Sequence, residues 1–186
     1  MNVLLGVTGG IAAYKAADII GGLKQYDCNI KVIMTEKAKS FITPLTLSTL
    51  SRNPIYDDSI EWSANGCIEH IDLANWADIL LVAPATANTI AKFGQGTADN
   101  LLSSVYLAFD FNKVIVVCPT MNTRMLNKNI EYVEKLRLRM NHHIVNPVEG
   151  LLACGATGNG KLAPTRTIVE KVIEVGKMNE SLFCRK

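Results

Sequence analysis

One cysteine stands in a stretch of the chain that is well suited to chemistry. Cys154 lies within residues Leu151 to Leu162, together with three glycines at 155, 158 and 160. So many glycines make the stretch too flexible for a core element, and a loop of this kind can close over a site as a lid. A thiol on such a lid has no core to pack into. We therefore predict a chemical role for Cys154.

The other cysteines give a different picture. The chain has five, an odd number, and no CxxC pair, which argues against a disulfide framework or a zinc ribbon. Reduced thiols are typical of cytosolic proteins, so we expect the protein to be cytoplasmic. Cys118 ends a predicted buried strand and could form the wall of a pocket. Cys28, Cys67 and Cys184 fall in predicted loops or in the tail, with no partner group nearby in the sequence.

The three histidines are a second source of chemistry. His70 is flanked by Glu69 and Asp72, which could orient its ring or raise its pKa, although a lone histidine is more often structural. His142 and His143 precede a late strand and are predicted to be solvated turn residues. No two histidines have the spacing of metal ligands, so we expect no metal site.

Small and polar residues follow four predicted buried strands at the points where the strands end. The segments are Thr8-Gly9-Gly10, Thr35, Pro84 to Thr89, and Pro119 to Asn122. Because ligands of parallel sheets bind outside the carboxyl ends of the strands, we expect these segments to lie close together around one site.

The first of these turns could bind a phosphate. Gly9 and Gly10 lie between a strand and a helix, and helix N-termini bind anions, although a tight turn without a ligand would need the same glycines. The spacing is not GxGxxG, so the dinucleotide fingerprint is absent. The hydroxyl of Thr35, unlike the carboxylate of Glu36, would tolerate a phosphate. A mononucleotide with a terminal phosphate is therefore favoured over a dinucleotide.

The later strand ends could bind a ring and a carboxylate. Small residues in Pro84 to Thr89 would let a flat ring approach the backbone, and Thr86 could reach a ligand while Asn88 or Thr89 caps the next helix. Plain capping explains that segment equally well. The side-chain NH₂ of Asn122 could hold a carboxylate, or Asn122 could be an ordinary turn residue.

These residues need a scaffold to position them. Along the chain, short apolar runs alternate with segments whose apolar residues have helical spacing. Such alternation predicts an α/β fold of three layers, with a mostly parallel sheet and helices on both faces. Strands are expected at 3–7, 30–34, 54–56, 79–83, 114–118 and 144–145, and an exposed loop at 59–66. Helices are expected at 11–25, 41–50, 89–93, 100–109, 131–140 and 165–177.

Length and charge limit the possible functions. The chain has 186 residues, which suggests about one domain, predicted at 1–177 with a flexible tail at 178–186. Its 19 basic and 17 acidic residues give a net charge of +2, too little to attract nucleic acid. No apolar run is long enough for a membrane span, and no secretory signal is visible. We expect neither a nucleic-acid nor a membrane partner.

Six segments, in order, resemble the flavin-containing cysteine decarboxylases over about residues 2–175. They are Gly9-Gly10-Ile11-Ala12, Glu69-His70-Ile71-Asp72-Leu73, the PATANT sequence at 84–89, Asp99-Asn100-Leu101-Leu102, a PxMNxxMW-type segment from Pro119, and an ACGxxGxG-type segment from Ala153. Three departures stand out: Thr86 replaces a serine, Leu126 replaces a tryptophan, and Lys161-Leu162 replaces Arg-Met.

The resemblance implies a flavodoxin/Rossmann-like fold and an FMN-dependent decarboxylation of 4′-phosphopantothenoylcysteine to 4′-phosphopantetheine, a step of coenzyme A biosynthesis. It implies three catalytic residues: His70 as the base of an oxidative half-reaction, Asn122 as the carboxylate binder, and Cys154 as the proton donor of a reductive half-reaction. The implied FMN-binding residues are Gly9, Gly10, Ile11, Thr35, Pro84, Ala85, Thr86, Ala87, Asn88 and Cys118. The implied substrate-binding residues are Met121, Asn122, Leu152 and Ala153.

The family also suggests how the chain assembles and what else it could be. Members form homotrimers, or dodecamers built from trimers, with sites between subunits. The length predicts a decarboxylase without the ligase domain fused to many relatives. The alternatives are a peptidyl-cysteine decarboxylase, a flavin prenyltransferase, a generic FMN-binding electron carrier and a regulatory subunit that binds another protein. Cys154 disfavours the first three, and the absence of acidic or low-complexity extensions disfavours the last.

Overall fold

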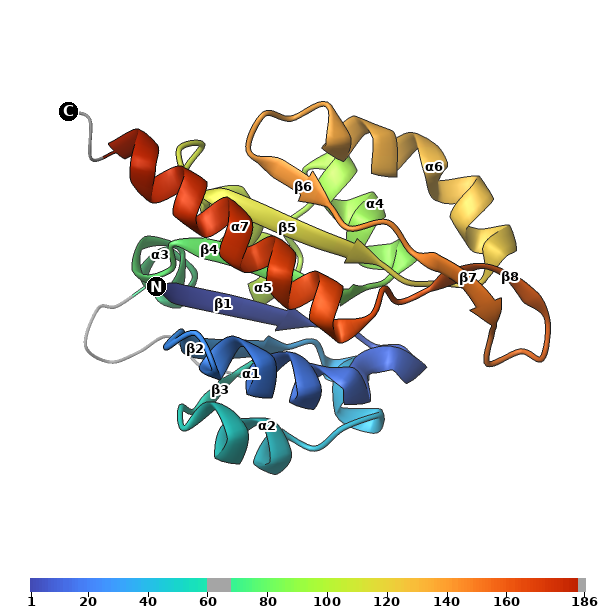
Figure 1. The fold of residues 1–186 in the computed structure, drawn as a ribbon, viewed down its shortest axis with the longest axis horizontal. Coiled ribbons are helices and arrows are strands. Elements are labelled where there is room, and N and C mark those ends of the chain that lie inside the picture. The colour runs from blue at the N-terminus through green and yellow to red at the C-terminus, as the bar shows by residue number, and fades with distance from the viewer. Residues whose placement is uncertain (60–67, 184–186) are drawn as a thin grey trace.

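A single parallel sheet organises the protein (Figure 1). The computed structural model describes residues 1–59 and 68–183, with side chains described up to residue 178. The sheet has six strands in the order β3-β2-β1-β4-β5-β6, and every pairing in it is parallel. The strands are β1 (Asn2–Val7), β2 (Asn29–Met34), β3 (Ile55–Tyr56), β4 (Ile79–Ala85), β5 (Val114–Pro119) and β6 (His142–Ile144).

Helices cover both faces of this sheet. On one face lie α1 (Ala16–Lys24), α2 (Pro44–Ser51), α7 (Thr165–Phe183) and the short 3₁₀ helices η1 (Ile11–Lys15) and η2 (Glu36–Ser40). On the other lie α3 (Glu69–Trp76), α4 (Ala87–Gln95), α5 (Leu101–Ala108) and α6 (Thr123–Arg137). The predicted three-layer α/β, flavodoxin-like fold is therefore confirmed.

The central strands are apolar along their whole length because both of their faces are covered. Every residue of β4 and of β5 is buried. Successive side chains point to opposite faces, so Val3 and Leu5 pack under α1 and α7, whereas Leu4 packs on the side of α4 and α5. These two apolar layers hold the strands rigidly and fix the position of the loops at their carboxyl ends.

A small hairpin stands apart from the main sheet, at the carboxyl ends of its strands (Figure 1). It pairs β7 (Val148–Leu151) with β8 (Thr157–Lys161) in antiparallel fashion. The sequence predicted a structureless glycine-rich loop here. In the structure this stretch begins at the last residue of β7 and includes all of β8, and Cys154 lies in the turn that joins the two strands.

The glycines of the hairpin allow it to lie against the connection between β5 and α6. The backbone N–H of Met121 donates to the carbonyl of Gly160 at 3.0 Å, and the hydroxyl of Thr123 donates to the carbonyl of Asn159 at 2.7 Å. Gly160 has φ +147°, and a Cβ there would overlap the Met121 carbonyl oxygen. A Cβ at Gly158 would overlap the Thr123 hydroxyl. These glycines therefore serve close packing rather than flexibility.

Several element boundaries differ from the prediction. Helix α6 begins at Thr123, where Asn122 caps it, instead of at the predicted residue 131. The first two turns of this helix carry few apolar residues, so the apolar spacing did not reveal them. Helix α7 continues to Phe183, so the predicted tail at 178–186 begins as helix. Residues 184–186, and most of the loop expected at 59–66, lie outside the described residues, as do Cys67 and Cys184.

His142 is not a solvated turn residue. It lies in β6, only 8% exposed, and its Nε2 is 2.9 Å from the hydroxyl of Tyr106. Arg139 donates to the same hydroxyl at 2.6 Å, and the Tyr106 ring stacks on Phe93. Burial, helped by the charge of Arg139 and the neighbouring His143, lowers the pKa of His142 to about 4. The imidazole is therefore a neutral part of the core.

Candidate active site

Two adjoining pockets lie at the carboxyl ends of β1, β4 and β5. The threonine pocket, of about 520 Å³, lies between the Gly9–Gly10 turn, the end of β2 and the start of α4. The hairpin pocket, of about 350 Å³, lies between η1, the β5–α6 connection and the turn of the β7–β8 hairpin. Gly10, Thr120 and Met121 line both, so a ligand in one pocket would adjoin a ligand in the other.

A hydrogen-bonded network shapes the threonine pocket. The buried hydroxyl of Thr8 donates to the carbonyl of Pro84 at 2.7 Å and accepts from the backbone N–H of Thr86 at 3.0 Å. Thr86 in turn caps α4, since its side chain accepts from the N–H of Thr89 at 3.5 Å. The end of β1 is thus tied to the start of α4, and the first residues of this helix, Ala87 and Asn88, line the pocket.

The two glycines of the first turn have different roles. A Cβ at Gly9 would overlap Lys37, so Gly9 permits the turn to lie against the residues after β2. A Cβ at Gly10 would meet only the methyl group of Thr86, at 3.8 Å. The missing side chain of Gly10 therefore leaves space that belongs to the pocket.

Charged groups at the rim of the threonine pocket are largely paired. Lys92 forms an ion pair of 2.6 Å with Asp99, and a hydrogen bond from this lysine lowers the pKa of the Asp99 carboxyl. Asp58 accepts from the backbone N–H of Leu101 at 2.7 Å, at the start of α5. The acids close to the pocket are thus held by partners.

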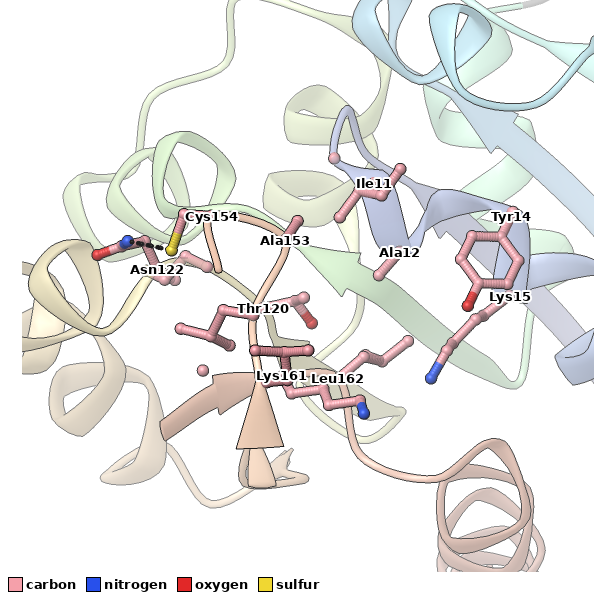
Figure 2. Close-up of a pocket in the computed structure, with 15 residues that line it drawn as sticks. Ile11, Ala12, Tyr14, Lys15, Thr120, Asn122, Ala153, Cys154, Lys161 and Leu162 are labelled. Atoms are coloured by element: carbon pink, nitrogen blue, oxygen red, sulfur yellow. Dashed lines mark hydrogen bonds between the residues drawn. The ribbon is translucent and has the colours of Figure 1, made fainter. Parts of the chain in front are cut away.

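The hairpin pocket brings Asn122 and Cys154 together (Figure 2). Asn122 is the N-cap of α6: its side-chain oxygen accepts from the backbone N–H of Arg124 at 2.7 Å. Its side-chain NH₂ donates to the sulfur of Cys154 at 3.3 Å. Because the cap fixes the oxygen on the helix side, the NH₂ group must face the pocket. Asn122 therefore combines the capping role of a turn residue with a donor for a ligand.

Most of the predicted site residues line one of the two pockets. Gly9, Gly10, Thr35, Thr86, Ala87 and Asn88 line the threonine pocket. Ile11, Met121, Asn122, Leu152, Ala153 and Cys154 line the hairpin pocket. The clustering expected at the carboxyl ends of the strands is found.

Four predicted residues line neither pocket. Pro84 and Ala85 are buried in β4. Cys118 is fully buried in the core, where burial raises the pKa of its thiol, so it does not form the expected pocket wall. Its place follows from strand alternation, because it shares a sheet face with Val116. His70 lies in the first turn of α3 and is not among the residues that line the two pockets.

The sequence did not single out Tyr14 and Lys15, which line the hairpin pocket. They follow Ile11 by three and four residues, so the turn of η1 brings them to the same side. This helical spacing was the signal in the sequence that could have identified them.

Among the described residues, no group of three or more His, Cys, Asp or Glu side chains could hold a metal ion. Over the same part of the chain, no helix is long and apolar enough to cross a membrane.

The family model "Flavoprotein" matches residues 1–177. The chain is 42% identical to a probable phosphopantothenoylcysteine decarboxylase of Streptococcus mutans, over 93% of this chain and 97% of that protein. It is 41% identical to the coenzyme A biosynthesis bifunctional protein CoaBC of Bacillus subtilis, over 91% of this chain, but it spans only 41% of that longer protein.

Solved structures agree with this relationship. A PPC decarboxylase mutant complexed with pantothenoylaminoethenethiol superposes with a TM-score of 0.87 at 30% identity, covering 95% of this chain and 98% of that one. The FMN-binding protein AtHal3 superposes with a TM-score of 0.83 at 31% identity, covering 94% of this chain and 95% of that one. With its fold, its two pockets and these relatives in agreement, the chain belongs to the Flavoprotein family.

Proposed function

We propose that this chain is a phosphopantothenoylcysteine decarboxylase, which converts 4′-phosphopantothenoylcysteine to 4′-phosphopantetheine with FMN in coenzyme A biosynthesis. The observation that carries this proposal is the hydrogen bond between Asn122 and Cys154 inside the hairpin pocket, which adjoins the threonine pocket. We assign the substrate to the hairpin pocket and the cofactor to the threonine pocket.

The residues of the threonine pocket fit FMN. The hydroxyls of Thr35 and Thr86 and the N-terminus of α4 offer donors to a phosphate. Gly10 and Ala87 leave room for a flat ring to approach the backbone. When bound, FMN supplies a redox partner that takes a hydride equivalent from the substrate and later returns it. The shared lining residues Thr120 and Met121 would bring the two reactants next to one another.

The substrate needs this redox step because direct loss of CO₂ would leave a carbanion without an electron sink. Oxidation of the cysteinyl side chain gives a thioaldehyde, whose C=S group is placed to accept the electrons of the breaking C–C bond. CO₂ then leaves and an enethiol forms. In this step Asn122 donates its side-chain NH₂ to the substrate carboxylate, in the direction that the helix cap imposes.

Cys154 completes the second half of the reaction. Return of the hydride to the enethiol requires a proton at the neighbouring carbon, and we assign that proton to the thiol of Cys154. The hydrogen bond from Asn122 goes to the sulfur as an acceptor, which leaves the S–H proton available. The product is then the saturated 4′-phosphopantetheine. This step separates the proposed activity from that of a peptidyl-cysteine decarboxylase that stops at the enethiol.

His70 is the proposed base of the oxidative half-reaction, supplied by another copy of the chain. Within one chain it lines neither pocket. Exposed apolar side chains flank both places: Ile68 and Ile71 near His70, and Ile11 and Tyr14 at the hairpin pocket. We propose that these surfaces meet in a homotrimer, or in a dodecamer of trimers, so that two subunits complete each site.

The free thiols of Cys28, Cys118 and Cys154 suit a reducing compartment, and we propose a cytoplasmic location.

One experiment tests the proposed function directly. The purified protein should carry flavin absorbance and, with phosphopantothenoylcysteine, should give a product lighter by the mass of CO₂. A product lighter by CO₂ and two further hydrogens would show arrest at the enethiol, and an unchanged substrate would refute the proposal.

A further inference from the structure

The hairpin pocket has two chemically different ends. At one end are the neutral amide of Asn122 and the thiol of Cys154. Lys15, from η1, and Lys161, the last residue of β8, also line the pocket. Figure 2 shows the amines of both lysines extending to the side opposite Asn122 and Cys154, with the hydroxyl of Tyr14 on the same side. The pocket therefore presents two cationic groups at one end only.

These two lysines are not engaged by acidic groups of the described chain. Lys39, Lys92 and Lys171 each form an ion pair with a carboxylate. No such pair is found for Lys15 or Lys161 among the residues that the structure describes. Two ammonium groups from different elements thus converge on one pocket with their charges unmatched, an arrangement that favours binding of an anion.

We propose that Lys15 and Lys161 form a phosphomonoester subsite, which binds the 4′-phosphate of the substrate while Asn122 binds its carboxylate. This inference rests on the proposed function. The substrate carries an anion at each end of a chain of neutral amide groups, and the hairpin pocket offers matching donors at its two ends. The subsite therefore sets both the orientation of the substrate and the preference for a phosphorylated one.

The position of Lys161 gives the subsite a second consequence. Lys161 lies on β8, and Cys154 lies in the turn of the same hairpin. A phosphate held by Lys161 would hold the hairpin over the substrate, so that binding energy from the remote phosphate keeps Cys154 at the reacting carbon. A substrate without phosphate should then release more enethiol in place of the saturated product.

The test compares phosphopantothenoylcysteine with unphosphorylated pantothenoylcysteine in the flavin-loaded enzyme. In the Lys15→Met and Lys161→Met variants, the ratio of kcat/KM for the two substrates should fall roughly tenfold each, and about 100-fold in the double variant, since each charge-assisted hydrogen bond is lost. The change should lie mainly in KM. Lys→Arg at either position should restore most of the ratio, and inorganic phosphate should inhibit the wild type more than the double variant.

Lys135→Met is the matched control, because Lys135 is an exposed lysine of α6 that lines neither pocket. The inference is overturned if the double variant keeps the wild-type substrate ratio, or if both substrates are slowed equally. A wild-type enzyme that decarboxylates neither substrate would instead refute the proposed function. A wild type that decarboxylates both equally well would refute the subsite alone.

Discussion

One amide links two of the three residues to which we assign catalysis: the side-chain NH₂ of Asn122 donates to the sulfur of Cys154 at 3.3 Å, across 32 residues of sequence. The other half of the same amide accepts from the backbone N–H of Arg124 at 2.7 Å. The residue at this position must therefore meet two requirements. A side chain that caps α6 but has no NH₂ group cannot donate a hydrogen bond into the pocket.

Asn122→Asp separates these two roles. The carboxylate can still cap α6, so the unfolding midpoint should change little, but it has no N–H and repels the substrate carboxylate. CO₂ release should fall roughly 10- to 100-fold or more. Asn122→Ala should lose activity and also about 1 kcal/mol of stability, as a lost cap does. Kinetics and thermal unfolding measured on both variants check this, and an active Asn122→Asp enzyme would contradict the role of the NH₂ group.

Cys154→Ser tests the proton donor. A hydroxyl is a far weaker acid than a thiol, so the enethiol should accumulate while CO₂ is still released. Mass spectrometry of the product distinguishes the enethiol from the saturated thiol by two hydrogens. Cys28→Ser, at a buried thiol outside both pockets, is the control and should give only the saturated product. Saturated product at an unchanged rate from Cys154→Ser would remove Cys154 from the mechanism.

Mixed oligomers test whether His70 acts on another subunit. Co-expression of His70→Ala with Asn122→Ala chains should restore roughly a quarter of wild-type activity, because random assembly gives that share of sites with both residues intact. His70→Ala mixed with the double variant is the control and should stay inactive. If the first mixture is inactive although the subunits exchange, the two residues do not come from different chains.

Gly160→Ala tests the docking of the hairpin. The added Cβ would overlap the Met121 carbonyl oxygen, which belongs to rigid backbone, so the hairpin and Cys154 must shift. Formation of saturated product should fall on the order of 100-fold, as expected for a misplaced group. Gly96→Ala is the matched control: it also has positive φ, at +79°, but nothing lies near its Cβ, so it should cost only about 1 kcal/mol of stability. Equal effects of the two substitutions on rate would contradict close packing as the reason for Gly160.

The buried histidine predicts a dependence of stability on pH. The folded-state pKa of His142 is about 4, below its usual 6.5, so the unfolded chain binds a proton first as the pH falls. The stability present above about pH 6.5 should be lost progressively toward pH 4, by on the order of 2 kcal/mol from this group. His142→Gln keeps an acceptor for Tyr106 without titrating. Urea unfolding at pH 7 and pH 5 should show a smaller loss for this variant, and equal losses would rule out His142 as the cause.

The fold was predictable because β1, β4 and β5 are continuous apolar runs separated by helical spacing, which is a local signal. The burial of His142 was not, because it depends on Tyr106, 36 residues away, and β6 is too short to show a pattern. The β7–β8 hairpin was missed for a related reason. Its glycines indicate flexibility when taken alone, and their packing role appears only against Met121 and Thr123.

The candidate site was predictable where strand ends carry it, as for Thr86 and Asn122. The prediction that Cys118 forms a pocket wall was wrong. Its position in the sequence indicates the end of a strand but not the sheet face to which its side chain points. The proposed role of His70 depends on a second copy of the chain, which neither the spacing nor the motif around it describes.

The separate two-stranded sheet divides the molecule into parts that can change independently. The threonine pocket and Asn122 are held by the six-stranded sheet and by α6, whereas Cys154 is carried by a turn that shares no strand with that sheet. Substitutions in a few turn residues can therefore remove the proposed proton donor while the sheet that supports the threonine pocket stays intact. In such a scaffold, a few turn residues would determine whether the product is saturated or unsaturated, and the rest of the enzyme could stay unchanged.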